Sequence, residues 1–247
     1  MRKILPLLVL ACAFTTQAEQ HQSHWGYEGA AGPDQWGNLE LDFATCKKGK
    51  QQSPIELSGA EIAKFSAPQL NYAAQPLKLT NNGHTLVQDV SAAPAHMSFG
   101  GQDYNLKQFH FHTPSEHHLN GKSFPMELHF VHSDADGQLA VVGVFVQQGT
   151  TNSTLQQLLQ KVPLLKDETV ADQNSALDLF ALMPAEKHFY HYMGSLTTPP
   201  CTENVHWLVL NTPIEASAEQ LKQLNQLVGN NSRPVQNLNA RTLTLTR

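Results

Sequence analysis

Three histidines stand in two short segments whose side chains alternate between polar and apolar. In the segment Gln108–His112, a β-strand would place His110 and His112 on one face, because successive side chains of a strand point to opposite faces. Glu127 and His129 continue the alternation further along the chain, and His129 completes a tripod if the two strands are neighbours. Three neutral imidazoles suit zinc or another borderline transition metal. They leave a fourth tetrahedral position open, as in a catalytic site.

Each segment also carries a polar residue two places before a histidine, on the same strand face. Gln108 precedes His110, and Glu127 precedes His129. A metal-ligating histidine usually donates its other ring N–H to such an acceptor, which fixes its tautomer. A bare H-x-H pattern is a weak signal, because alternating histidines also occur on solvated strand faces. The two acceptors and the third histidine favour the metal site over that alternative.

Other interpretations of the histidines are weaker. His110, His112 and Glu116 also resemble the first metal motif of cupin barrels, in which the glutamate is a ligand of iron or manganese. The glycine spacing beyond them does not fit, and the chain has no matching second motif. We expect the remaining histidines near the tripod to be surface or hydrogen-bonded structural residues, namely His117, His118 and His132.

The segments that must position these residues have the pattern of β-strands. Strand-like alternation occurs over 77–80, 85–90, 104–112, 126–132, 139–147 and 205–210. The run 139–146 is apolar on both faces, so we expect it in the middle of a sheet that is covered on both sides. Helices are expected over 218–228, after Ser153 and around 177–183. Ser217 and Gln220 form a capping box for the first of these, and Gly229 ends it. This pattern predicts a mainly β fold with peripheral helices.

The chain of 247 residues carries a net charge of −5 without runs of like charge, which gives no indication of nucleic acid or an anionic membrane as partner. Its start resembles a signal peptide, with two basic residues, an apolar stretch over 4–14 and a small-x-small cleavage pattern. About 11 apolar residues are fewer than the roughly 20 that a membrane-spanning helix needs. We therefore expect residues 1–18 to be removed on export and residues 19–247 to form one domain. Lipid attachment at Cys12 is a weaker alternative.

Removal of the leader leaves two cysteines, Cys46 and Cys201. An even pair in a chain bound for an oxidising compartment predicts a disulfide, and two buried free thiols are the alternative. The style of the leader favours a periplasmic location, with secretion beyond the cell as a second option.

Over most of its length, from about Ser23 to Arg241, the sequence resembles the α-carbonic anhydrases. The matching blocks are SHWGYEG at 23–29, KQQSPIEL at 50–57, NNGH at 81–84, QFHFHTPSEH at 108–117, MELHFVH at 126–132, LAVVGVF at 139–145, YMGSLTTPPC at 192–201 and NNSRPVQNLNAR at 230–241. The resemblance implies a single domain around a large twisted, mostly antiparallel sheet of about ten strands. It also implies that the disulfide braces the loop at 195–201 and that the Ser53-Pro54 and Pro199-Pro200 bonds are cis.

The resemblance gives roles to the residues around the metal. The zinc ligands would be His110, His112 and His129, and their hydrogen-bond partners would be Gln108, Glu127 and the backbone of Asn231. Thr197 would accept a hydrogen bond from zinc-bound hydroxide and donate its own proton to Glu116. Because that proton is then engaged, Thr197 can only accept, which aims a hydroxide lone pair at the substrate. Without the resemblance, local turn roles would be expected for both residues.

The resemblance also implies a substrate pocket and a proton path. The pocket positions are Val131, Val141, Leu196, Thr198, Val205 and Trp207. His84 would be the proton shuttle, because histidine titrates near neutrality, although an exposed structural histidine is the alternative. Tyr27 and Asn82 would order water between shuttle and metal. Val87 departs from the commonest vertebrate form, which often has a polar residue there, and this puts the details of the path in question.

The activity implied is the zinc-dependent, reversible hydration of carbon dioxide to bicarbonate and a proton, by zinc-hydroxide attack with histidine proton shuttling. The partner would then be a small-molecule substrate. A non-catalytic zinc-binding or partner-binding protein on the same fold is the alternative, but such relatives generally lack one or more of the histidines. Bacterial relatives are often dimers, so a homodimer is a further expectation.

Overall fold

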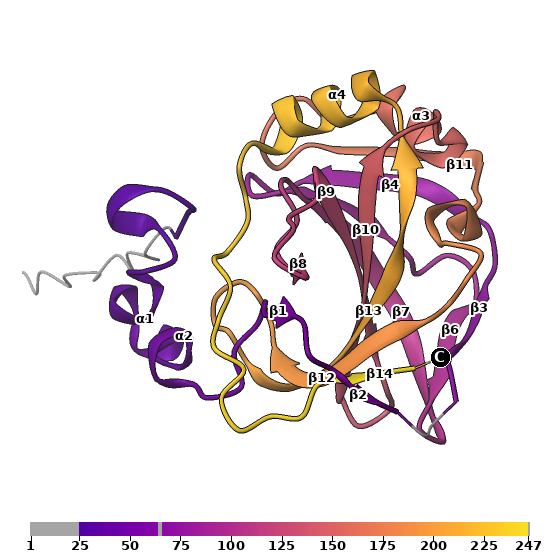
Figure 1. Ribbon diagram of the computed structural model, residues 1–247. Coiled ribbons are helices and arrows are strands. Elements are labelled where there is room, and N and C mark those ends of the chain that lie inside the picture. The colour runs from indigo at the N-terminus through magenta and orange to yellow at the C-terminus, as the bar shows by residue number, and fades with distance from the viewer. Residues whose placement is uncertain (1–24, 64–65, 247) are drawn as a thin grey trace, which may run out of the picture.

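The computed structural model describes residues 25–63 and 66–246 of the chain. Within these residues, twelve strands form one large sheet: β2 (Glu61–Ile62), β3 (Gln69–Tyr72), β4 (Gln75–Asn81), β5 (Leu86–Asp89), β6 (Ala95–Phe99), β7 (Gln102–His112), β9 (Met126–Ser133), β10 (Leu139–Gln148), β11 (Thr169–Leu177), β12 (Phe189–Ser195), β13 (Glu203–Ala216) and β14 (Thr244–Leu245). Their order is β11-β4-β5-β7-β9-β10-β13-β12-β14-β2, and β3 pairs with β6, which pairs with β7 (Figure 1). The short strands β1 (Glu56–Leu57) and β8 (His118–Leu119) pair with each other.

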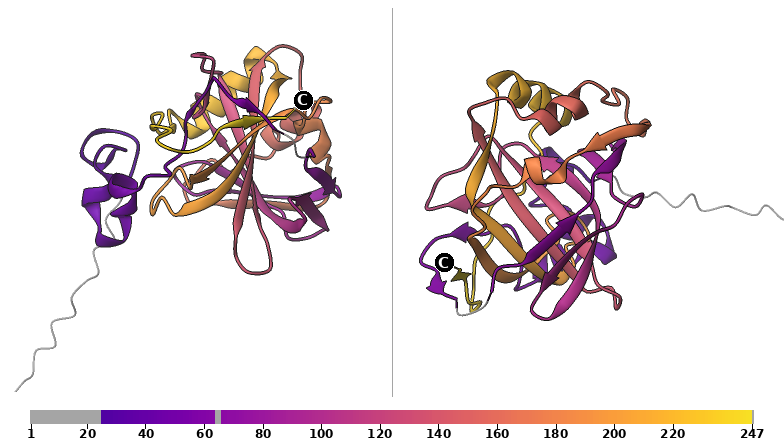
Figure 2. Two further views of the ribbon diagram at one scale, coloured as in Figure 1. Left: turned by 60° about the horizontal axis from the view of Figure 1, so that its bottom comes forward. Right: turned by 90° about the vertical axis from the view of Figure 1, so that its right-hand side faces the viewer.

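The described strands of the large sheet are antiparallel to their neighbours except in the pairs β10–β13 and β14–β2. Figure 2 shows the sheet twisting as it crosses the molecule. The predicted fold class, a large twisted and mostly antiparallel sheet with few helices, is therefore confirmed. The cis bonds expected at Ser53-Pro54 and Pro199-Pro200 are present, and Thr113-Pro114 is also cis.

The core lies on both faces of the central strand β10, which is placed between β9 and β13. Its side chains alternate between two hydrophobic clusters, with Val142 and Val144 in one and Val141 and Phe145 in the other. All four side chains are buried. The prediction that this apolar run lies in a sheet covered on both sides is confirmed.

The helical segments lie at the periphery of the sheet (Figure 1): η1 (Gly29–Ala31), α1 (Trp36–Leu39), η2 (Leu41–Phe43), α2 (Thr45–Lys48), α3 (Ser153–Leu159), η3 (Leu179–Leu182) and α4 (Ala218–Val228). The predicted capping box starts α4, where Ser217 accepts from the backbone of Gln220 and the Gln220 side chain accepts in return. Gly229 ends the helix with a positive φ of 68°, which glycine adopts without steric cost.

The six predicted strands correspond to β4, β5, β7, β9, β10 and β13, with ends that differ by a few residues. Sequence reasoning missed the other described strands, and it missed the helical turns before β1. The missed strands are β1, β2, β3, β6, β8, β11, β12 and β14. β11 exposes most of its side chains, so its sequence lacks the apolar alternation on which the prediction depended. The expected leader and Cys12 lie outside the described residues. Among the described residues, no helix has the length and apolar character to cross a membrane.

Candidate metal centre

The three predicted ligands meet because β7 and β9 are antiparallel neighbours in the register that pairs His110 with His129. The side chain of His112 lies on the same face, one strand repeat along β7. Their ring centroids are 4.5 to 5.3 Å apart, and one nitrogen from each ring lies within 4.8 Å of the others. Phe109 and Phe130 point to the opposite face, where they are fully buried. The alternation of each strand thus separates the polar tripod from the core.

Each ring uses one nitrogen for a hydrogen bond and keeps the other for the centre of the tripod. His110 Nδ1 lies 2.9 Å from Gln108 Oε1, and His112 Nδ1 lies 2.8 Å from the backbone oxygen of Asn231. His129 uses its other nitrogen, Nε2, which lies 3.0 Å from Glu127 Oε1. The nitrogens left to bind a metal are therefore Nε2 of His110, Nε2 of His112 and Nδ1 of His129.

The donor set fits a zinc ion. His112 Nε2 is buried and has no hydrogen-bond partner among the described residues, which is costly unless a ligand or ion occupies that position. Burial, and then the neighbouring His129 ring, lower the pKa of His112, although Glu116 acts in the opposite direction. Burial and the two neighbouring rings hold the pKa of His110 well below its ordinary value. Neutral imidazole is the form that binds metal, so these rings are in the required state at neutral pH.

Glu127 is held as a carboxylate by four donors. Its Oε2 accepts from the backbone N–H groups of Glu116 (3.0 Å) and His117 (2.9 Å). Its Oε1 lies 2.7 Å from His117 Nδ1 and 3.0 Å from His129 Nε2. Burial alone would raise the pKa of Glu127, but the two histidines bring it well below the ordinary value. A Cβ at Gly143 would lie only 2.9 Å from Oε1, so glycine leaves room for the carboxylate.

His117, Glu127 and His129 also gather three metal-binding atoms within 4.8 Å of one another. Those atoms face each other because the carboxylate accepts from both rings. We therefore assign this second cluster to hydrogen bonding and the first cluster to the metal.

The structure does not contain the hydrogen bond expected from Thr197 to Glu116. Glu116 Oε1 accepts from the backbone N–H of Arg233 at 2.8 Å, and the buried Oε2 has no partner in the part of the chain that the structure describes. The carboxylate lies against the tripod, with Oε2 3.8 Å from His129 Nδ1 and Oε1 3.5 Å from His112 Nδ1. Oε2 is therefore the oxygen that the expected bond from Thr197 would use.

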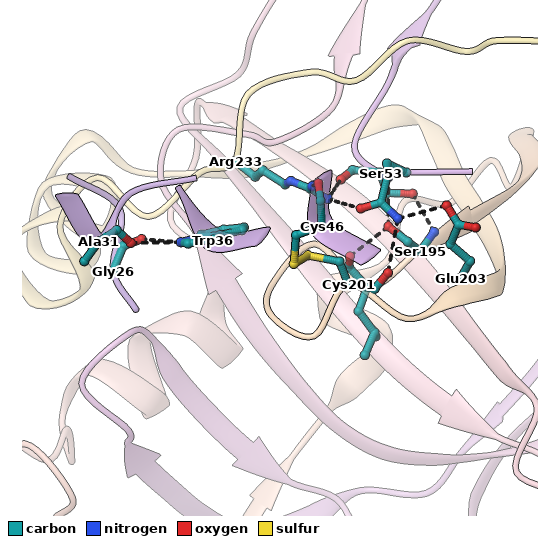
Figure 3. The surroundings of a disulfide bond; sticks show 11 residues. Gly26, Ala31, Trp36, Cys46, Ser53, Ser195, Cys201, Glu203 and Arg233 are labelled. Carbon is teal, nitrogen blue, oxygen red and sulfur yellow. Dashed lines mark hydrogen bonds between the residues drawn. A yellow bond between two sulfur atoms is a disulfide. The ribbon is translucent and has the colours of Figure 1, made fainter. Parts of the chain in front are cut away.

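The predicted disulfide between Cys46 and Cys201 is present and joins α2 to the loop that follows Thr197. Arg233 supports the same junction (Figure 3). Its Nη2 donates to Cys46 O at 2.9 Å, and its Nη1 donates to Ser53 O at 2.8 Å. Burial lowers the pKa of this guanidinium to about 10. Sequence reasoning gave no role to Arg233, because its partners come from distant parts of the chain.

A cavity of about 130 Å³ opens beside the tripod, and His84, Tyr27, Asn82 and Thr198 line it together with His110 and His112. The ring of His84 stacks on Trp25 with centroids 3.8 Å apart and planes at 7°. Asn82 Oδ1 accepts from the backbone N–H groups of His84 and Thr85, both at 2.9 Å. Burial, and secondarily the charge of Glu116, raise the pKa of Tyr27. Val87 also lines the cavity, in place of a polar side chain.

The other predicted pocket residues form an apolar wall. Val131, Val141, Leu196, Val205 and Trp207 belong to or pack against one hydrophobic cluster. The Trp207 ring stands edge-on to that of the tripod residue His129, with centroids 4.8 Å apart. Of the six predicted pocket residues, Thr198 alone lines the cavity described above.

The three other histidines near the tripod are hydrogen-bonded in the interior or partly exposed, as expected. His117 is fully buried between Glu127 and the Tyr192 hydroxyl. His132 is buried on the sheet face opposite the tripod, with its Nε2 2.8 Å from the hydroxyl of Tyr72. His118 is partly exposed, 3.9 Å from a carboxylate oxygen of Glu56.

Comparison with known proteins agrees with this geometry. Residues 31–247 match the family model described as eukaryotic-type carbonic anhydrase. A carbonic anhydrase of Pectobacterium atrosepticum is 40% identical over 237 residues, which cover 96% of each chain. One from Neisseria gonorrhoeae is 40% identical over 243 residues, covering 98% of this chain and 96% of the other. The α-carbonic anhydrase of Thermovibrio ammonificans, solved with the inhibitor sulfanilamide, superposes with a TM-score of 0.86 and 40% identity, over 91% of this chain and 99% of that one.

Proposed function

The chain belongs to the eukaryotic-type, or α-type, carbonic anhydrase family, and on that premise we propose that it catalyses the zinc-dependent, reversible hydration of carbon dioxide to bicarbonate and a proton. The observation that carries the proposal is the convergence of three imidazoles, each with its other nitrogen already hydrogen-bonded. His110, His112 and His129 would hold the ion. A zinc ion bound by three histidines lowers the pKa of a water molecule toward neutrality and so supplies a nucleophile.

Glu116 and Thr197 would orient that nucleophile. The backbone N–H of Arg233 donates to one oxygen of the carboxylate, and no donor within residues 25–63 and 66–246 reaches the buried Oε2. A hydrogen bond donated by the single proton of Thr197 to Oε2 would satisfy both groups. The Thr197 oxygen could then only accept a hydrogen bond, so the oxygen of the nucleophile next to it would have to carry a proton to donate. The carbon dioxide molecule, which is apolar, would rest against the Trp207 wall beside His129.

His84 would carry the surplus proton to the solvent. It lines the same cavity as His110 and His112, and its backbone is held by Asn82. A histidine that titrates near neutrality exchanges protons readily in both directions. The Tyr27 hydroxyl is protonated at neutral pH, and burial raises its pKa further, so it can hydrogen-bond water between the tripod and His84. Val87 offers no such group, so the water path would depend on Tyr27, Asn82 and Thr198.

Metal content and carbon dioxide hydration, measured together, test the proposal. Wild-type protein should bind one zinc ion per chain and lose its activity when a chelator removes the ion. His112→Ala should lose both zinc and activity, whereas His118→Ala, at a partly exposed position away from the tripod, should keep both. Stoichiometric zinc without hydration activity would instead favour the non-catalytic zinc-binding alternative.

The shuttle role has a separate test. His84→Ala should lower kcat in weak buffer and leave kcat/KM for carbon dioxide unchanged, because proton transfer follows hydration. Added imidazole should restore kcat. An unchanged kcat in weak buffer would remove His84 from the mechanism.

Two further parts of the proposal follow from the chain and its relatives. The related Thermovibrio enzyme was solved with sulfanilamide, so we expect sulfonamides to inhibit this protein at the metal. We also propose that the protein acts after export through a cleaved leader, in the periplasm, and the disulfide supports this. Fractionation of expressing cells, with the N-terminus of the mature chain determined, would check the compartment.

A further inference from the structure

A series of buried hydrogen bonds begins at the tripod and ends next to Thr197. It joins six residues, which we call the relay: His129, Glu127, His117, Tyr192, Ser53 and Ser195. All six residues, the metal ligand His129 included, have no more than 1% of their surface exposed. The last member, Ser195, ends β12 two residues before Thr197.

The direction of every bond in the relay follows from its two ends. The Ser195 N–H can only donate, and it donates to Ser53 Oγ at 3.0 Å. At the other end, the Glu127 carboxylate can only accept, so a neutral His117 carries its proton on Nδ1 and donates it to Oε1 at 2.7 Å. His117 Nε2 is then an acceptor, and the Tyr192 hydroxyl donates to it at 2.7 Å. The Tyr192 oxygen in turn accepts the Ser53 proton at 2.8 Å.

The same carboxylate oxygen accepts from His129 Nε2, which leaves His129 Nδ1 without a proton and directed to the metal position. His110 and His112 present Nε2 instead, because their Nδ1 atoms are engaged. His129 therefore needs the opposite tautomer from its two partners. If His117 carried its proton on Nε2, the lone pair of its Nδ1 would face the negatively charged Glu127 Oε1.

The far end of the relay holds the start of the loop that carries Thr197. Ser53 N donates to Ser195 Oγ at 2.9 Å, in addition to the bond that Ser53 Oγ receives. Trp207 Nε1 donates to Ser195 O at 2.8 Å. Figure 3 shows Ser53 and Ser195 facing each other beside the disulfide. The relay thus connects a metal ligand to the segment that positions Thr197.

We propose that His117 and Tyr192 are positioning residues of the hydration reaction: through the relay they fix the tautomer of His129 and anchor the end of β12 from which the Thr197 loop begins. The inference rests on the proposed function, because it concerns the same metal site. A polar network that only stabilises the fold is the competing account, and the experiments below separate the two.

The first experiment reads the tautomers without activity. Nitrogen-15 NMR of the metal-free, histidine-labelled protein should show the proton of His117 on Nδ1 and that of His129 on Nε2. A proton on His117 Nε2, or on both of its nitrogens, would overturn the assigned direction of the relay. A proton on His129 Nδ1 would overturn it as well.

The second experiment compares two matched tyrosine variants. Tyr190 lies two residues before Tyr192 on the same strand face, is also buried, and forms no side-chain hydrogen bond that the described residues show. Tyr192→Phe should speed zinc dissociation about tenfold and lower kcat/KM, as loss of an outer hydrogen-bond partner does at metal sites. Tyr190→Phe should leave both at the wild-type value.

Equal zinc dissociation rates in the two variants would show that the relay only stabilises the fold. Ser53→Ala, which removes the next hydroxyl along the relay, provides the same comparison if Tyr192→Phe does not fold. The effect should appear in kcat/KM, in contrast to the His84 variant, whose effect is on kcat. If wild-type protein takes up no zinc, the proposed function fails, whereas the NMR result still decides the direction of the relay.

Discussion

Replacement of His132 by Gln should flatten the dependence of stability on pH in the acid range. Burial lowers the pKa of His132 from its ordinary value of 6.5 to about 4, although backbone hydrogen bonds at Ala140 and Phe130 oppose the shift. The unfolded chain therefore binds this proton more tightly than the folded chain. The stability associated with neutral His132 is complete above about pH 6.5 and is lost as the pH falls toward about 4. With about 1.4 kcal/mol per pKa unit, the loss is about 2 kcal/mol at about pH 5 and about 3 kcal/mol at about pH 4.

Urea unfolding across this pH range, with a chelator present to remove metal-dependent stability, measures the effect. Gln at 132 can still donate and accept hydrogen bonds but does not titrate. The free energy of unfolding of the variant should therefore rise relative to that of the wild type by these amounts as the pH falls. Tyr72→Phe is the control, because it removes the hydroxyl on His132 Nε2 without removing the burial that shifts the pKa. It should cost about 1 kcal/mol at every pH. Parallel pH profiles for the wild type and the His132 variant would refute the reasoning.

Three further changes test the packing around the site. The disulfide spans a sequence separation of 155 residues, so replacing Cys46 and Cys201 by Ala should cost about 5 kcal/mol in urea unfolding on the chain-entropy model; a loss below about 2 kcal/mol would contradict that account. Ser217→Ala removes the capping box of α4 and should cost about 1 kcal/mol, and no change would mean that the cap contributes nothing. Gly194→Ala would place a Cβ 2.2 Å from Ser53 Oγ, so the free energy of unfolding, measured with urea, should fall by about 1 to 3 kcal/mol. An unchanged free energy of unfolding would show that the relay residues can move aside without cost.

The tripod could be placed from the sequence because its geometry is local. Period-two alternation puts His110 and His112 on one face of β7, opposite Phe109, and His129 on one face of β9, opposite Phe130. The pairing of the two strands in the register that aligns His110 with His129 then brings the three rings together. The acceptors Gln108 and Glu127 follow from the same alternation, and the structure places both within hydrogen-bond distance of the predicted rings. The sheet-centred fold was predictable for the same reason.

The remainder of the site depends on contacts between distant segments. Asn231 meets His112 across 119 residues, and Tyr192 meets His117 across 75 residues, so no local pattern indicates either pair. Arg233 reaches Ser53 across 180 residues. The resemblance to a known family supplied Asn231, but it gave no role to the other two contacts. The bond expected between Thr197 and Glu116 is absent, and Glu116 Oε1 accepts instead from the backbone N–H of Arg233, 117 residues away.

The loop that carries Thr197 owes its position to the rest of the chain. Cys201 is bonded to Cys46, and Ser195 is hydrogen-bonded to Ser53, 142 residues away. These contacts are buried, and breaking one of the hydrogen bonds would leave an unsatisfied polar group at a cost of about 1 to 3 kcal/mol. The loop is therefore fixed before a substrate arrives, which is the condition for electrostatic preorganisation. It follows that substitutions at 46–53, which do not line the cavity, should change the orientation of Thr197 and hence the rate of hydration.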